Sequence, residues 1–268
     1  MIMRRGIAAI VAVTLGIGIF SVTPVSAGKV NEIVKKDTIP LIDIAGKQRM
    51  LSQRIAKDYL YIGSDIAVDK ASKQLKASMN EFVKNMERID SSTNDEEIKN
   101  LLSFVKMSLD EMKANISKPF NLDNAQLVMD LSESILEGSQ YVVDSLKKKL
   151  KVKESEVVAK AGKQRMLAQR IAKYYMAYQA GIKDSNTVAQ MKRAVEEFAD
   201  NHKFLISNKD NTSSINQKLA EVDKLWKIVY KFYLNIEKGG LPFIVFTSTD
   251  EITGRMDEIT KLYVKLYK

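Results

Sequence analysis

Apolar residues follow a helical spacing along most of this chain. When residues 44–62 are projected with the angular spacing of an α-helix, the apolar side chains collect in one sector, which predicts a helix with one core-facing stripe. Few runs of β-branched residues alternate with a period of two, so β-strands are not expected. The pattern therefore predicts an all-α protein.

The breaks between apolar segments divide each half of the chain into four helices. The first helix is expected to begin near Pro40, because the first helical turn does not need the N–H that proline lacks. A polar stretch ends the second helix, and Asn94 is placed to cap the third. The four helices of the first half are expected at about residues 40–62, 70–89, 95–116 and 125–150. The second half follows the same plan.

One segment occurs twice with almost no change. Residues 45–59, AGKQRMLSQRIAKDY, and residues 161–175, AGKQRMLAQRIAKYY, are identical at 13 of 15 positions, whereas the flanking sequence differs much more. The offset between the two copies is 116 residues. We therefore expect two tandem copies of one domain, covering residues 28–150 and 151–268.

The junction between the copies decides how the two bundles are arranged. No glycine or proline occurs between Gly138 and Gly162, so the fourth helix of the first copy is expected to continue into the first helix of the second. This long continuous helix would place the bundles end to end. The alternative is a bend near residues 151–155 that folds the bundles side by side.

The first 27 residues are not expected to belong to either domain. Arg4 and Arg5 precede an apolar run from Ile7 to Phe20, and small residues end at Ala27, a layout typical of a secretory signal peptide. The alternative is that this segment stays uncleaved as a membrane anchor. No later segment is apolar enough to cross a membrane. The protein is therefore expected to be periplasmic or secreted.

The composition excludes several kinds of chemistry. The chain has no cysteine, and His202 is its only histidine, so thiolate or histidine metal sites are not expected. We recognise no Gly-rich phosphate loop and no acid/base pair, which predicts no enzymatic activity and no cofactor. The formal charge is +9, or +7 without Arg4 and Arg5. In an exported protein this charge favours anionic ligands or acidic partners over nucleic acid.

The polar residues of the repeated segment have different expected roles. Gln48 falls within the apolar stripe, so its amide is expected to form a hydrogen bond with a neighbouring helix. Arg49 lies at the edge of the stripe beside small residues, where a closely packed helix would partly desolvate it. Lys47 and Arg54 point to another side and are expected to be solvated, as are the lysines at 147–149.

Arg49 recurs as Arg165 with the same surroundings, and the planar guanidinium group suits small oxyanions. The alternative for each arginine is an ordinary ion pair with a glutamate on another helix. Gly46 and Gly162 each cost about 1 kcal/mol of helix stability relative to alanine, but they permit close approach of a ligand or a partner helix. These two arginines and two glycines are the candidate ligand-binding residues.

The segments AGKQRMLSQRIAK and AGKQRMLAQRIAK resemble the first-helix motif of PilJ-type sensory domains, which occur at the N-termini of type IV pilus-associated chemotaxis transducers. They are more loosely similar to the corresponding helix of NarX-like nitrate/nitrite sensors. The resemblance implies two up-down four-helix bundles that bind nitrate-like anions where two first helices meet across a dimer. Arg49 and Arg165 match the anion-binding arginine, and Gly46 and Gly162 match the glycine whose backbone lies beside the anion.

The leading hypothesis is an exported, non-enzymatic sensory protein that binds a small oxyanion, with nitrate or nitrite as the first candidates. Since no second membrane span, HAMP segment, kinase or methyl-accepting region follows the repeats, it is expected to pass information to a membrane receptor or pilus-associated partner. End-to-end bundles would need a second chain at each site, as in a parallel homodimer, whereas side-by-side bundles would let Arg49 and Arg165 face each other within one chain. The alternative function is an envelope interaction or scaffold module without a small-molecule ligand.

Overall fold

The computed structural model describes residues 27–150 and 153–268 and confirms an all-α fold, with no β-strand in these two ranges. The expected signal peptide, residues 1–27, lies outside the described residues except for Ala27, where the first helix begins. The first repeat forms α1 (Ala27–Gly63), α2 (Val68–Ser91), α3 (Glu96–Ile116) and α4 (Leu122–Leu150). The second repeat forms α5 (Lys153–Ala180), α6 (Ser185–Ile206), α7 (Ser213–Leu234), the short 3-10 helix η1 (Ile236–Lys238) and α8 (Pro242–Tyr267).

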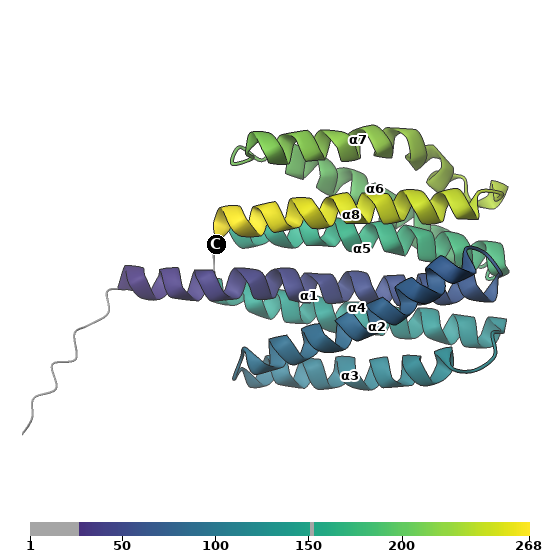
Figure 1. Ribbon diagram of the computed structural model, residues 1–268, viewed down its shortest axis with the longest axis horizontal. Coiled ribbons are helices and arrows are strands. Elements are labelled where there is room, and N and C mark those ends of the chain that lie inside the picture. Colours follow the sequence, from purple (N-terminus) through teal and green to yellow (C-terminus); the bar gives the residue numbers. More distant parts are fainter. Residues whose placement is uncertain (1–26, 151–152) are drawn as a thin grey trace, which may run out of the picture.

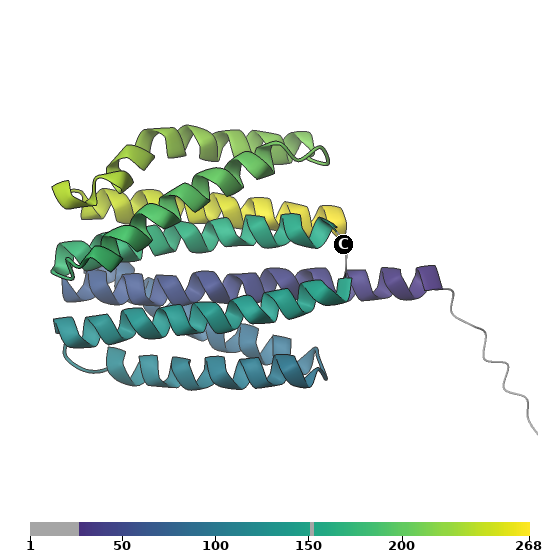
Figure 2. The same ribbon diagram turned by 180° about the vertical axis from the view of Figure 1, so that it is seen from behind.

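The two helices that carry the repeated segment, α1 and α5, lie side by side at the centre of the molecule and run in the same direction (Figure 1). The fourth helix of each repeat, α4 or α8, packs on this central pair. Figures 1 and 2 show α2 and α3 on the outer side of the first repeat, and α6 and α7 on the outer side of the second. The two copies of the repeated segment therefore meet within a single chain.

The prediction of one long helix through the junction is wrong. Helix α4 ends at Leu150 and α5 begins at Lys153, and α5 runs back beside α4 in the opposite direction (Figure 2). Residues 151–152 lie outside the described residues. The physical reason for this arrangement is the burial of the two central helices.

Helix α5 is buried around nearly its whole circumference. Between Val157 and Ala177 the only side chains that are not buried are Lys160, Lys163 and Arg170. A helix buried on all sides needs neighbours on all sides, and end-to-end bundles would leave one of its faces in water. Side-by-side packing supplies the missing cover, because α1 and α5 bury each other.

Two expected helix starts also differ from the structure. Helix α1 begins at Ala27 rather than near Pro40, which lies inside the helix and removes only one backbone hydrogen bond from it. The side chain that caps α3 belongs to Asp95 instead of Asn94, and it accepts a hydrogen bond from the Ile98 N–H at 3.2 Å. No described helix has the length and apolar character needed to cross a membrane.

Candidate functional site

The four candidate binding residues converge where α1 and α5 meet. A Cβ atom added to Gly46 would lie 3.2 Å from Nη2 of Arg49 and 3.6 Å from Nη2 of Arg165. A Cβ atom added to Gly162 would lie 3.1 Å from Nη2 of Arg165 and 3.6 Å from Nη2 of Arg49. The two guanidinium groups therefore occupy related positions between the glycines. Because glycine has no side chain, both positions leave room for the two guanidinium groups.

Gln48 and Gln164 have the structural role expected for Gln48. Each buried amide donates from Nε2 to a backbone carbonyl oxygen on the second helix of its own repeat, at 3.0 Å in both cases. The acceptors are Phe82 on α2 and Phe198 on α6. These equivalent bonds place the two motif helices in the same way within their bundles.

Arg165 is fully buried and is paired with two carboxylates. Its Nη1 donates to Asp257 on α8 at 2.6 Å, and its Nη2 donates to the Asp43 side chain on α1 at 2.7 Å and to the Asp43 carbonyl oxygen at 3.2 Å. Two acidic groups therefore offset one buried positive charge. Arg165 therefore forms ion pairs with other helices, as the alternative to anion binding expected, although its partners are aspartates rather than glutamates.

Arg49 is equally buried, but its partners are neutral. Its Nη1 donates to the Gln140 side chain on α4 at 2.5 Å, and its Nη2 donates to the Ala159 carbonyl oxygen on α5 at 3.1 Å. Among the described residues, no carboxylate forms a salt bridge with it. Asp144 lies behind Gln140, where it accepts a hydrogen bond from the glutamine amide at 2.9 Å. Arg49 is thus a buried cation without direct charge compensation.

The difference between the two arginines comes from two substitutions in otherwise matching positions. Ala159 of α5 corresponds to Asp43 of α1 at the offset of 116 residues. Gln140 of α4 corresponds to Asp257 of α8 at an offset of 117 residues, since both contact the Nη1 atom of their motif arginine. At both positions the Arg49 side lacks the carboxylate that the Arg165 side has.

The pKa values follow from these surroundings. Burial and the neighbouring charge of Arg165 lower the pKa of Arg49 to about 10, so Arg49 remains protonated at neutral pH. Burial acts in the same direction on Arg165, but Asp43 and Asp257 more than offset it and raise the pKa of Arg165. An anion placed beside Arg49 would supply the compensation that Arg165 already has.

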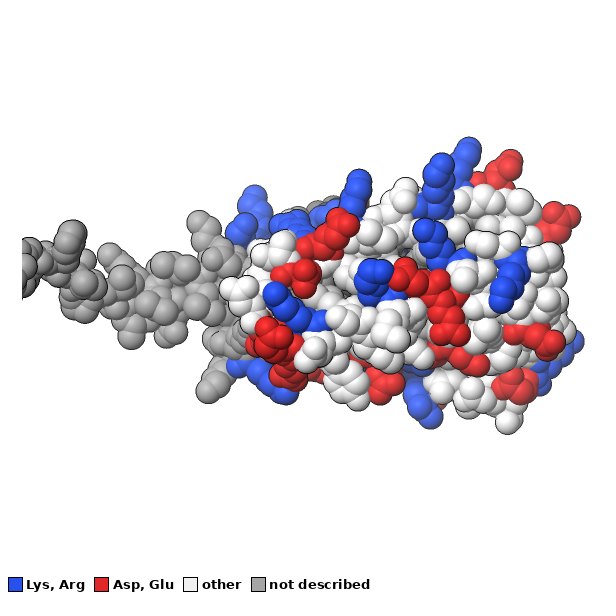
Figure 3. Space-filling view, turned by 90° about the horizontal axis from the view of Figure 1, so that it is seen from below, with Lys and Arg blue, Asp and Glu red and all other residues white. Residues whose placement is uncertain are grey.

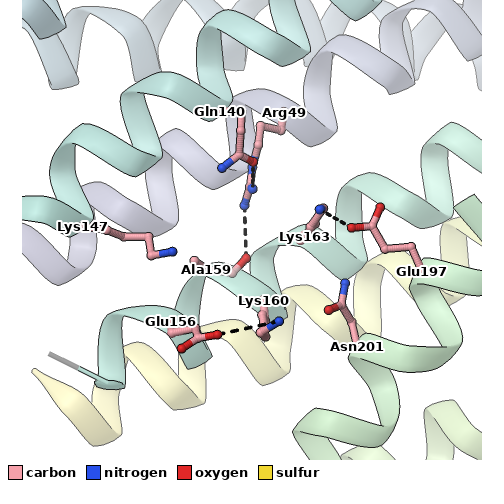
Figure 4. Close-up of a pocket in the computed structure, with 9 residues that line it drawn as sticks. All are labelled: Arg49, Gln140, Lys147, Glu156, Ala159, Lys160, Lys163, Glu197 and Asn201. Carbon is pink, nitrogen blue, oxygen red and sulfur yellow. Dashed lines mark hydrogen bonds and ion pairs between the residues drawn. The ribbon is translucent and has the colours of Figure 1, made fainter. Parts of the chain in front are cut away.

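A cavity of about 160 Å³ opens beside Arg49, between α4, α5 and α6 (Figure 4). Its walls carry four cationic and two acidic side chains, for a net charge of +2, or +1 if Asp144 behind Gln140 is included. The lining residues are Arg49, Gln140, Lys147, Glu156, Ala159, Lys160, Lys163, Glu197 and Asn201. The described residues contain no cluster of side chains suited to a metal ion. The site is therefore suited to binding an anion.

The expectation that Lys47, Arg54 and their copies are solvated is only partly right. Lys47 and its copy Lys163 are partly exposed and pair with Glu81 and Glu197. Arg170, the copy of Arg54, is instead only 14% exposed and pairs with Glu133 at 2.6 Å. It is held there because Glu133 reaches it from α4 of the other repeat.

Sequence reasoning missed the two lysines at the end of the repeated segment. Lys57 and Lys173 are fully buried, and each pairs with a carboxylate on the fourth helix of the other repeat. Lys57 binds Asp250 on α8 at 2.8 Å, and Lys173 binds Glu133 on α4 at 2.5 Å. Both lysines lie within the nearly identical segment, and that recurrence was the available signal. These crossed ion pairs connect the two repeats on either side of the central helices.

Asp58 supports a prediction about pH dependence. Burial raises its pKa from 3.8 to about 7, although Lys57 at 3.2 Å acts to lower it. Because this pKa is higher in the folded state, the folded protein binds more protons at this group than the unfolded chain does between about pH 4 and pH 7. The contribution of Asp58 to the free energy of unfolding therefore falls as the pH rises through this range. We therefore expect Asp58→Asn to stabilise the protein, and to do so more at pH 8 than at pH 5.

Urea unfolding of wild type and Asp58→Asn at both pH values measures this difference. The other carboxylates, such as Asp257 with its pKa lowered to about 2, are common to both proteins and cancel in the comparison. A difference in unfolding free energy that does not change between pH 5 and pH 8 would show that Asp58 titrates normally.

Comparison with known protein families gives a match in each half of the chain. The family described as "Type IV pili methyl-accepting chemotaxis transducer N-term" matches residues 40–133 and residues 151–236. These two segments cover about two thirds of the chain, and each contains one copy of the repeated segment. No curated protein and no solved structure matches the chain significantly.

Proposed function

Because the chain belongs to the family of type IV pili methyl-accepting chemotaxis transducer N-terminal domains, we propose that it is a non-enzymatic sensory protein that binds a small oxyanion at Arg49. The observation that carries this proposal is the contrast between two equivalent buried arginines. Arg165 is paired with two aspartates, whereas Arg49 has only neutral partners and lies at a cavity. A buried charge without a partner is costly, and a bound anion removes that cost.

Nitrate and nitrite are the first ligands to test. Both are small planar oxyanions, and a guanidinium group offers several N–H donors in one plane that match their oxygen atoms. The backbone at Gly46 and Gly162 leaves room around both guanidinium groups. In this proposal Arg49 contacts the anion, while Arg165 and the two glycines position the helices that form the site.

In this proposal a single chain provides the whole site, and no homodimer is required. The two repeats, assigned to residues 28–150 and 151–268, supply one central helix each and replace the two subunits of a dimeric sensor.

We further propose that residues 1–27 direct export, so that the site works in the periplasm or outside the cell and reports to a membrane receptor or pilus-associated partner. Figure 3 shows basic and acidic side chains interspersed on one face of the molecule, which gives that face no single-sign charge patch.

The proposal predicts that Arg49→Gln abolishes nitrate binding, because glutamine is polar but carries no positive charge. Isothermal titration calorimetry of nitrate into wild type and Arg49→Gln measures this directly. Lys47→Gln is the matched control, since it removes a positive charge from the same motif at a site that is ion-paired with Glu81. If wild type shows no heat of nitrate binding, or if Arg49→Gln binds nitrate as wild type does, the oxyanion site is excluded. An interaction or scaffold function would then be the better explanation.

A further inference from the structure

The cavity beside Arg49 is larger than a single oxyanion needs. Its volume is about 160 Å³, whereas about 10–15 Å³ on the same measure is enough for one water molecule. Arg49 is only 1% exposed and forms one end of the space. A ligand held by Arg49 therefore has room to extend along the cavity between α4 and α5.

Lys147 of α4 provides a second cation in this cavity. Figure 4 shows its ammonium group directed toward the space between α4 and α5. The carboxylate paired with it is Asp144, at 3.9 Å, which is near the limit for an ion pair. Lys163 binds Glu197, and Lys160 pairs with Glu156 at 3.8 Å and also lies 4.8 Å from the centre of the Phe204 ring. Lys147 is thus the lysine of the lining that has a single, distant partner, although its sequence context suggested only a solvated surface.

Asn201 of α6 adds an unused hydrogen-bond donor. The residue is 8% exposed and lines the cavity, and its Nδ2 atom is buried without an acceptor among the described residues. A buried donor left unpaired destabilises the folded state. A ligand oxygen in the cavity would remove this destabilisation.

The Arg165 side has a cation of its own in Lys261, which pairs with Asp257 at 2.7 Å, but Lys147 and Lys160 have no cationic counterparts there. At the offset of 117 residues, Lys147 corresponds to Val264 of α8, and at the offset of 116 residues, Lys160 corresponds to Ile44 of α1. The Arg165 side therefore has apolar residues where the Arg49 side has lysines. The extra lysines occur on the same side as the uncompensated arginine, which indicates one extended anion site.

We infer that this site takes an organic dianion, with one carboxylate on Arg49 and the second on Lys147. Asn201 donates its free N–H to one of the ligand oxygens. The net charge of the lining is +2, or +1 with Asp144 included, which favours an anion over a zwitterion. Lys147 provides a cation for a second carboxylate, which a monovalent anion held at Arg49 would leave unused. This inference rests on the proposed oxyanion site at Arg49 and specifies the class of ligand that fills the rest of the cavity.

Calorimetric titration of the full chain with nitrate, acetate, glycine, and the dicarboxylates malonate, succinate and glutarate tests the inference. We expect at least one dicarboxylate to bind about tenfold more tightly than acetate or nitrate. Lys147→Gln is expected to remove that advantage by weakening dicarboxylate binding much more than acetate binding. Lys148→Gln is the matched control, because it makes the same change of charge on the next residue of α4, which is exposed and outside the cavity lining.

The outcomes separate this inference from the proposed function. If nitrate or acetate binds through Arg49 but no dicarboxylate binds more tightly, the dianion is excluded and the oxyanion site remains. If Lys147→Gln and Lys148→Gln weaken binding equally, the effect is general electrostatics and Lys147 is not a ligand contact. Glycine binding more tightly than acetate would show that Glu156 or Glu197 receives an ammonium group, which also overturns the inference. If no anion binds, or if binding persists in Arg49→Gln, the proposed function itself fails.

Discussion

Arg165→Gln is expected to lower the free energy of unfolding by about 3 kcal/mol, whereas Arg49→Gln should change it by less than about 1 kcal/mol. Removing Arg165 leaves Asp43 and Asp257 without their main partner in a largely buried place, where their side chains are 19% and 20% exposed. Breaking a buried ion pair costs about 3–5 kcal/mol, and the partial exposure of the aspartates places this case at the lower end. Arg49 has no carboxylate partner that its removal would leave unpaired. Its removal also relieves the electrostatic repulsion between Arg49 and Arg165.

Urea unfolding followed by circular dichroism measures this contrast. The buffer should be free of nitrate and low in salt, because an anion bound at Arg49 would stabilise wild type and exaggerate the effect of Arg49→Gln. The two variants are matched controls for each other, since they make the same change at equivalent positions of one repeated motif. Equal losses of stability would contradict the assignment of Arg165 to structure and Arg49 to binding.

The double variant Asp43→Ala and Asp257→Gln is expected to make folding strongly dependent on anions. These changes give Arg165 the partners that Arg49 has, namely an alanine backbone and a glutamine side chain. Two adjacent buried cations would then lack compensation, and we expect a loss of about 3–5 kcal/mol in nitrate-free buffer. Nitrate should restore part of this loss, because an anion that binds only the folded state stabilises it by mass action.

Thermal unfolding with increasing nitrate measures the recovery. We expect the unfolding temperature of the double variant to rise more steeply with nitrate than that of wild type. The control removes two acidic groups elsewhere, in Asp110→Ala with Asp200→Ala, whose side chains are 60% and 77% exposed. A parallel rise in the double variant and the control would mean that nitrate acts only as a general salt.

The helices were predictable from the sequence, but their arrangement was not. Apolar spacing and polar breaks located the four helices of the first repeat to within a few residues, except for the start of α1, and predicted the same plan for the second repeat. They missed the boundary between α4 and α5. The junction was misread because the absence of glycine and proline shows only that a helix is permitted there. Helix α5 is buried on nearly every side because it packs against helices that lie far away in sequence. That packing is possible only if the chain reverses direction between α4 and α5.

Repetition singled out Arg49 and Arg165 without revealing how their surroundings differ. Arg49 and Arg165 sit in nearly identical segments, so any local analysis assigns them the same role. Their partners come from other helices, and Gln140 and Asp257 become equivalent only after a one-residue change of register between the repeats. For the same reason Lys147 looked like a surface lysine, because nothing near it in sequence indicates the cavity.

In the proposed function, one chain forms one anion site from its two motif helices. The stoichiometry of nitrate binding tests this, measured by calorimetry on protein whose mass in solution is known from sedimentation velocity. We expect one nitrate per chain, in a monomer as well as in any larger assembly. Half a nitrate per chain would place the site between two molecules, and two per chain would show that Arg165 binds as Arg49 does.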